Sequence, residues 1–140
     1  MTKKQTLKQQ EVWKKFNLAK IYLASAKNSL KFADIRLAAD ASYNALELAM
    51  KAAILAKKDS FPKRHGGVAQ LFSLLYIKEG PLSSSYGEKI GRALELRNKA
   101  RYDEEAIVTK DQALENIKLA QEVIDSLGKN NSTVKGISIL

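Results

Sequence analysis

The chain has 140 residues, a length that fits one domain, and 45% of them are apolar, which is enough to build a sizeable core. Only 2 Pro and 7 Gly occur among many Ala, Leu, Lys, Glu and Gln residues, so we expect an all-α fold. With 0 Cys and 1 His, disulfide scaffolds, thiolate zinc sites and cysteine nucleophiles are excluded, and a Ser-His-Asp triad is hard to assemble.

Positive charge is concentrated in the first part of the chain. The 24 basic and 15 acidic residues give a net charge of +9. Residues 1–31 contain 8 Lys and 1 Glu, which makes +7, whereas residues 32–140 contain 16 basic and 14 acidic groups, which makes +2. A local basic face attracts phosphate, nucleic acid or an acidic partner, although a lysine-rich face that only interacts with water gives the same pattern. Because neither a signal peptide nor an apolar run of about 18 residues occurs, we expect a cytoplasmic protein with no membrane segment.

In chain order, the spacing of apolar residues first predicts a helix over 11–30. Its apolar positions are Trp13, Phe16, Ala19, Leu23, Ala26 and Leu30. A second helix is predicted over 35–57, and it ends before Pro62 because the residue preceding a proline avoids the helical region. A loop over 63–67 then leads into a shorter predicted helix over 68–77.

Two further helices are predicted in the second half of the chain. One covers 85–102, and the other follows the capping-box sequence over 109–112, with Gly128 just past its end. We therefore expect one helical domain over 1–128, an up-and-down bundle of four or five helices. A polar and flexible C-terminal tail is expected over 129–140.

Four polar residues interrupt the second predicted helix, which is otherwise apolar or small around most of its circumference. They are Asp40, Asn44, Glu47 and Lys51. At 100° per residue, their spacings of four, three and four gather them into a strip about 60° wide beside the core face. Buried polar groups cost stability unless they are paired, so this strip should line a wet cleft or meet complementary groups on another helix.

The fourth predicted helix supplies such groups. Arg97 and Arg101 each follow an apolar residue of its stripe by seven positions, so both guanidinium groups fall within that stripe. Two arginines there need acidic partners or an anionic ligand. One interpretation is a structural network in which Asp40 or Glu47 pairs with an arginine, within the chain or across a dimer interface. The other is a phosphate-binding or catalytic cleft, and the spacing alone leaves both open.

Two segments and their order also resemble a known family. Residues 38–53 read Ala-Ala-Asp-Ala-Ser-Tyr-Asn-Ala-Leu-Glu-Leu-Ala-Met-Lys-Ala-Ala, and His65-Gly66 opens a short helix after them. Residues 94–102 read Leu-Glu-Leu-Arg-Asn-Lys-Ala-Arg-Tyr. With the last predicted helix, this pattern over residues 9–128 resembles HEPN domains, named for higher eukaryote and prokaryote nucleotide binding.

The resemblance implies a HEPN-like helical bundle that forms a homodimer, with arginine-bearing helices meeting at a cleft between subunits. Many members are RNases, or toxins paired with minimal nucleotidyltransferases as antitoxins. Their cutting motif is an Arg, four to six residues and a His, in which Arg stabilises phosphate charge and His is the general acid or base. Arg97 and Asn98 match the start of this motif. The permitted His positions hold Tyr102, Asp103 and Glu104, and a Tyr with a pKa near 10 is a poor proton shuttle at neutral pH.

The leading hypothesis is therefore a non-catalytic HEPN-type homodimer that binds a nucleotide, RNA or a nucleotidyltransferase-type antitoxin. In it, Arg97 and Arg101 hold phosphate, Tyr102 stacks on a base and the lysine-rich first helix follows the backbone. The candidate binding residues are Arg97, Asn98, Arg101, Tyr102, Asp40, Asn44, Glu47 and Lys51. No cofactor is expected, and no metal site is indicated because one His and scattered carboxylates do not fix a ligand set.

Two alternatives remain. The first is a toxin-type, metal-independent endoribonuclease in which Arg97 acts at the cleavage site and His65 or Tyr102 replaces the missing base. His65 lies on another segment, so the fold or a partner subunit would have to bring it to the arginine. The second is a purely structural dimerisation protein whose polar strip is a buried network of ion pairs.

Overall fold

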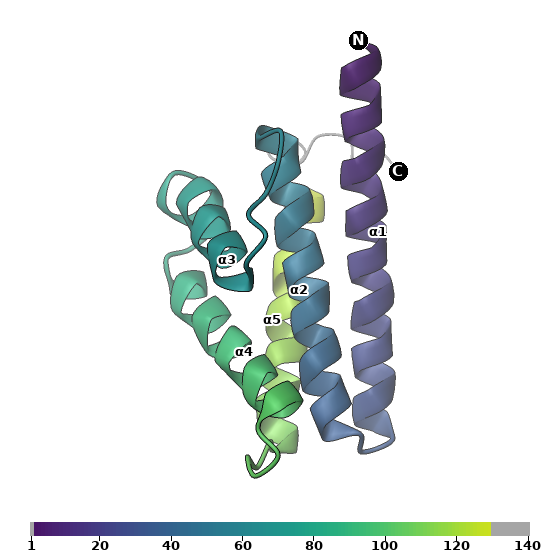
Figure 1. Ribbon diagram of the computed structural model, residues 1–140, viewed down its shortest axis with the longest axis vertical. Coiled ribbons are helices and arrows are strands. Elements are labelled where there is room, and N and C mark those ends of the chain that lie inside the picture. Colours follow the sequence, from purple (N-terminus) through teal and green to yellow (C-terminus); the bar gives the residue numbers. More distant parts are fainter. Residues whose placement is uncertain (1, 130–140) are drawn as a thin grey trace.

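The computed structural model describes residues 2–129, and almost all of them lie in helices (Figure 1). Within these residues the elements are α1 (Lys3–Lys31), α2 (Ile35–Lys57), α3 (His65–Ser73), the π-helical segment η1 (Leu74–Lys78), α4 (Ser85–Tyr102) and α5 (Lys110–Lys129). The expected all-α class is confirmed. Apart from Lys129, which ends α5, the tail predicted over 129–140 lies outside the described residues.

α2 is the central helix of the bundle. It packs against α1, α3, α4 and α5, while α1 contacts α2 and α5 (Figure 1). This arrangement follows from the sequence, because most alanines of α2, among them Ala38, Ala45, Ala49 and Ala52, are fully buried and let neighbouring helices approach closely. As a result, α1 lies on one side of α2 and α4 lies on the other (Figure 1).

A tight turn joins α1 to α2. Ala33 N donates to Leu30 O at 3.0 Å, and Asp34 N donates to Ser29 O at 2.8 Å, which is the hydrogen-bond pattern of a Schellman motif. The motif needs a left-handed residue, and Ala33 takes that conformation with φ of 63°. Glycine is the usual residue at this position, which is why its absence hides the turn in the sequence.

Several predicted boundaries are wrong. α1 starts at Lys3 rather than at residue 11, because the Thr2 hydroxyl accepts from Gln5 N while the Gln5 side chain accepts from Thr2 N. The predicted apolar face of this helix is also wrong at one position. Trp13 is 36% exposed and lies outside the core, whereas its neighbour Val12 is 3% exposed and lies in the core with Phe16.

The third and fifth helices also differ from their predicted extents. The loop expected over 63–67 ends early, since α3 already begins at His65. α5 continues through Gly128 to Lys129, so Gly128 is a helical residue and not the residue past the helix end. The predicted capping box is present, with Thr109 and Gln112 hydrogen-bonded to each other's backbone N–H at 3.1 and 3.0 Å. No helix within residues 2–129 is long and apolar enough to cross a membrane.

Candidate functional site

His65 lies beside the middle of α2 because the chain after α2 turns back along it before α3 begins (Figure 1). Its Nδ1 is 2.5 Å from Glu47 Oε1. The Glu47 side chain is 7% exposed and that of His65 is 45% exposed. A carboxylate that accepts from Nδ1–H fixes the ring and leaves Nε2 available for a proton transfer or a ligand. Lys51 Nζ contacts the second oxygen of Glu47 at 3.5 Å.

Asp40 is the acidic partner of both arginines of α4. Its Oδ1 lies 3.3 Å from Arg97 Nε and 3.5 Å from Arg101 Nη1. The Arg97 side chain is 5% exposed, so its charge is buried, whereas 46% of the Arg101 side chain is exposed. The sequence placed both guanidinium groups in the apolar stripe of the helix. The structure buries only that of Arg97.

An open groove follows the end of α4. It is lined by His65, Arg97, Asn98, Lys99, Tyr102, Asp103 and Glu104. Arg97 Nη1 donates to Asn98 Oδ1 at 3.1 Å, and the ring of Tyr102 lies 5.7 Å from Arg97 Cζ and 5.8 Å from Arg101 Cζ. Tyr102 itself is 67% exposed, so one flat aromatic surface is held against two cations and remains accessible to a base or another ring.

Tyr43 brings a buried hydroxyl group to the same place. Its side chain is fully buried on α2, and its hydroxyl has no hydrogen-bond partner among residues 2–129. Burial raises the pKa of Tyr43 well above 10, Glu47 raises it further, and Arg97 acts in the opposite direction. A buried hydroxyl without a partner is uncommon, because an unpaired polar group in the core costs stability.

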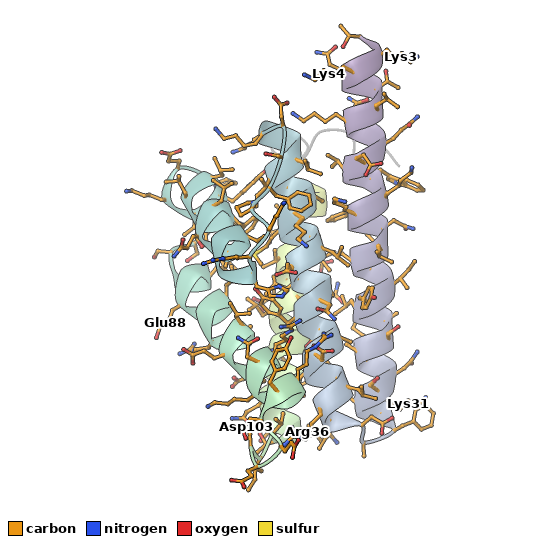
Figure 2. All side chains as sticks on the ribbon, viewed as in Figure 1. Lys3, Lys4, Lys31, Arg36, Glu88 and Asp103 are labelled. Carbon is orange, nitrogen blue, oxygen red and sulfur yellow. The ribbon has the colours of Figure 1, made fainter. Side chains whose placement is uncertain are left out.

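Arg36 fixes the end of α4 and therefore the groove. From the first turn of α2, its Nη1 donates to the carbonyl oxygens of Ala100 at 3.1 Å and Asp103 at 2.9 Å, and its Nη2 donates to Ala106 O. Figure 2 shows Arg36 next to Asp103 at this end of the bundle. One cation thus pairs with a carbonyl group in the last turn of α4 and with two carbonyl groups of the turn that follows Tyr102.

Comparison with known proteins places the chain in a family. A family model described as HEPN domain matches residues 12–130. The chain belongs to the HEPN family. This HEPN domain is also similar to "Putative toxin MJ0605" of Methanocaldococcus jannaschii, with 30% identity over 120 residues that cover 86% of this chain and 88% of that protein. The resemblance seen in the sequence is confirmed.

The predicted site residues fall into two connected groups in this HEPN domain. Asp40 joins Arg97 and Arg101, while Glu47 joins His65 and Lys51. Glu47 pairs with neither arginine. Asn44 is half-buried between the two groups on α2 and takes part in none of these ion pairs. The groove nevertheless unites them, because His65 and Arg97 both line it.

Two residues of the site, Arg36 and Tyr43, were missed by the sequence reasoning. Tyr43 lies on an apolar helix face, where an aromatic ring needs no further explanation, and Arg36 lies in a first helical turn, where a charge is normally exposed. A partial signal for Arg36 existed, since α4 ends without a glycine or an Asn and its carbonyl groups had to find other donors.

A second, more enclosed groove of about 420 Å³ lies between α4 and α5. Its walls carry charges of both signs, four basic and three acidic, namely Lys89, Arg92, Lys99, Lys118, Glu95, Glu115 and Glu122. It lacks the buried arginine, the histidine and the exposed aromatic ring that gather at the end of α4, so the candidate site is the α4-end groove. Within residues 2–129, no group of three or more His, Cys, Asp or Glu side chains is placed to hold a metal ion.

Proposed function

We propose that this HEPN domain binds single-stranded RNA at the α4-end groove, with Arg97 and Arg101 acting on the phosphates. The observation that carries the proposal is that two guanidinium groups share the single carboxylate of Asp40. One positive charge therefore remains without a carboxylate in this cluster, and the half-exposed Arg101 can present it to an anion.

Tyr102 adds the second element of RNA recognition. Its exposed ring lies over both guanidinium groups and is available to stack on a base, an interaction worth about 1–3 kcal/mol per base in proteins that bind single strands. Asn98 and Lys99 line the same groove and can reach sugar or phosphate oxygens. The lysines of α1 supply a wider positive field that attracts the strand.

The test is fluorescence-polarisation binding to a labelled single-stranded RNA across a salt series. We expect affinity to fall with salt, and Arg101→Ala to weaken binding and reduce the salt slope by about one counterion. Arg92→Ala is the matched control, because Arg92 is also exposed on α4 but pairs with Glu88 outside the groove. Equal effects of the two substitutions, or no binding at low salt, would contradict the proposal. Competition by a mononucleotide would show that a nucleotide is the ligand instead.

A second candidate function is metal-independent RNA cleavage, favoured by the Glu47–His65 pair. Although the expected motif His is absent, His65 reaches the Arg97 groove from α3, and a carboxylate orients its ring. His65 Nε2 would take the proton of a ribose 2′-hydroxyl as its oxygen attacks phosphorus. The bond between phosphorus and the 5′-oxygen breaks, the leaving oxygen takes a proton from water, and a 2′,3′-cyclic phosphate forms. The relative named as a toxin supports this candidate.

Cleavage is tested on a gel with the same RNA in the presence of EDTA. His65→Ala should abolish cutting while leaving binding in place, whereas Tyr102→Phe should retain cutting, because Phe keeps the ring. If the unmodified protein leaves the RNA intact, RNA binding without cleavage remains the proposed function. Loss of cutting in Tyr102→Phe alone would instead identify Tyr102 as the acid or base.

The proposed function also includes two protein partners, a second copy of the chain and an antitoxin. We propose that the domain acts as a homodimer and that a nucleotidyltransferase-type antitoxin binds it, which the toxin relative supports. The purely structural alternative makes a distinct prediction. If the Asp40 pairs only hold the fold, the Arg97→Ala, Arg101→Ala double variant unfolds, whereas a functional site predicts a folded variant that has lost RNA binding. Circular dichroism together with the binding assay distinguishes the two.

A further inference from the structure

The turn that follows Tyr102 brings acidic side chains into the α4-end groove. Asp103 and Glu104 line it together with Arg97 and Lys99. Negative charge repels the phosphates of a nucleic acid, so a carboxylate in such a groove lowers affinity unless it meets a hydrogen-bond donor. In a single strand, the edges of the unpaired bases carry such donors. The two acidic residues are therefore candidates for contacts to a base.

Asp103 has a structural role, whereas the Glu104 carboxylate is free. Asp103 Oδ1 accepts from Glu105 N at 3.1 Å, and Asp103 O accepts from Ala106 N at 3.3 Å, so Asp103 is the first residue of a tight turn. Glu104 and Glu105 are the central residues of that turn, and both are exposed. Within residues 2–129, the Glu104 carboxylate makes no hydrogen bond or ion pair. Glu105 does not line the groove.

Arg36 fixes the backbone that carries Glu104. Its Nη1 donates to Asp103 O at 2.9 Å, and its Nη2 donates to Glu104 O at 3.4 Å and to Ala106 O. The backbone is therefore held at Glu104 itself and on both sides of it, and the side chain starts from a constant place two residues after Tyr102. A group that is already positioned loses little freedom when it binds, so its contact can distinguish one base from another.

We propose that Glu104 selects guanine for the base that stacks on Tyr102, an inference that rests on the proposed binding of RNA at this groove. An ionised carboxylate has two acceptor oxygens and no donor. The Watson–Crick edge of guanine carries two neighbouring donors, N1–H and the N2 amino group, so both oxygens of Glu104 can accept from it. Adenine, cytosine and uracil each present a single donor group with an acceptor beside it, so one carboxylate oxygen would face an acceptor.

Lys99 supplies a donor that complements Glu104. Its side chain lines the same groove and makes no ion pair with any residue that the structure describes. An ammonium group only donates, and guanine O6, an acceptor, lies next to N1 on the same edge. The groove thus offers one donor group and two acceptor oxygens, which is the complement of the acceptor and two donors of the guanine edge.

The test compares labelled RNAs that differ in one base. Each is a single-stranded oligouridylate of the same length with G, A, C or U at its centre, and fluorescence polarisation measures binding at low salt. We expect the strand with guanine to bind about tenfold more tightly than the others, as a bidentate contact to a base discriminates. Glu104→Gln should remove most of this preference. A strand with inosine, which lacks the N2 amino group, should bind the unmodified protein less tightly than the guanine strand and bind Glu104→Gln equally well.

Glu105→Gln is the matched control, because Glu105 is the next residue of the same turn, is also exposed and lies outside the groove. Each substitution removes one negative charge, so each should raise the affinity for all four RNAs by a similar factor. Only Glu104→Gln should change the ratio between guanine and the other bases. Both variants should keep the helical circular dichroism signal of the unmodified protein, since both side chains are exposed.

The outcomes separate guanine selection from RNA binding. Equal affinities for the four RNAs, or a guanine preference that persists in Glu104→Gln, would overturn guanine selection and leave RNA binding in place. If no RNA binds but guanosine monophosphate binds more tightly than adenosine monophosphate, and Glu104→Gln removes the difference, guanine selection is supported and the ligand is a nucleotide. Absence of binding to every RNA and to guanosine monophosphate would overturn both proposals.

Discussion

Tyr43 carries a hydroxyl group that contributes nothing visible to the fold. It is fully buried and lacks a hydrogen-bond partner among residues 2–129. An unpaired buried hydroxyl costs about 1–3 kcal/mol, so Tyr43→Phe should raise the free energy of unfolding by about 1 kcal/mol. If the hydroxyl serves a ligand in the groove, the same variant should bind RNA more weakly. Urea denaturation and fluorescence polarisation measure the two effects.

Tyr76→Phe is the control for Tyr43→Phe. The Tyr76 hydroxyl donates to Ala53 O at 2.5 Å, so its removal should lower the free energy of unfolding by about 1 kcal/mol and leave RNA binding unchanged. A Tyr43→Phe variant that loses stability to the same extent would show that its hydroxyl is paired in solution and has a structural role.

Asp40 limits the positive charge that the groove presents. It contacts both Arg97 and Arg101, so Asp40→Asn removes the one negative charge of that cluster. In water, two like charges about 4 Å apart repel by about 1 kcal/mol, so removal of the Asp40 charge relieves a bound phosphate of that repulsion. We therefore expect RNA affinity to rise about fivefold. Glu88→Gln, which frees Arg92 on the same helix, should have a smaller effect. An unchanged or weaker affinity in Asp40→Asn would place the phosphate away from these arginines.

At the level of elements, the Arg36 clamp connects the start of α2 to the end of α4. Arg36→Met keeps an unbranched apolar stem but removes the donors to Ala100, Asp103 and Ala106. Hydrogen bonds from charged groups contribute about 1.5–3 kcal/mol, and we expect a loss near 3 kcal/mol in the free energy of unfolding. Amide hydrogen exchange should accelerate first over residues 103–106. Uniform acceleration over all helices would show that Arg36 acts on global stability and does not hold this turn.

The α1–α2 turn offers the opposite case, in which a substitution should stabilise the protein. Ala33 adopts a φ of 63°, a conformation that costs an alanine about 1 kcal/mol and costs a glycine almost nothing. Ala33→Gly should therefore raise the free energy of unfolding by several tenths of a kcal/mol, after the greater backbone entropy of an unfolded glycine is counted. Ser25→Gly, in the middle of α1, is the control and should destabilise. Denaturation curves with equal m-values would show whether Ala33→Gly raises or lowers the free energy of unfolding.

Sequence patterns predicted α2 and α4 to the residue, because their apolar periodicity and their ends depend on local chemistry. They also identified Asp40 and Arg97 as polar groups facing the core. They could not reveal that His65 meets Glu47, since that contact depends on the path of the chain between α2 and α3. The same limit applies to Arg36, whose partners lie more than sixty residues away.

On the scale of the whole molecule, α2 separates two surfaces of different chemistry. The α4-end groove on one side combines a buried arginine, a histidine and an exposed tyrosine. The outer face of α1 on the other side carries exposed apolar residues, among them Leu18 and Ile21, together with exposed lysines. α2 packs against α1 on one side and against α3 and α4 on the other, so it separates the two surfaces. Substitutions at exposed positions can therefore alter one surface without altering the other. Substitutions of exposed residues on the outer face of α1 should thus leave the contacts of Arg97 intact.

The buried tyrosines set the response of the whole fold to alkaline pH. Burial raises the pKa of Tyr43 and Tyr76 well above the unfolded value near 10, so the folded state keeps both protons where the unfolded chain would release them. Their contribution is complete below about pH 10 and is lost as pH rises above it. We expect the free energy of unfolding to fall steeply there. In a tyrosinate absorbance titration, both rings should ionise only together with loss of the helical circular dichroism signal. Ionisation of all 5 tyrosines while the helices persist would show that water reaches these rings in the folded state.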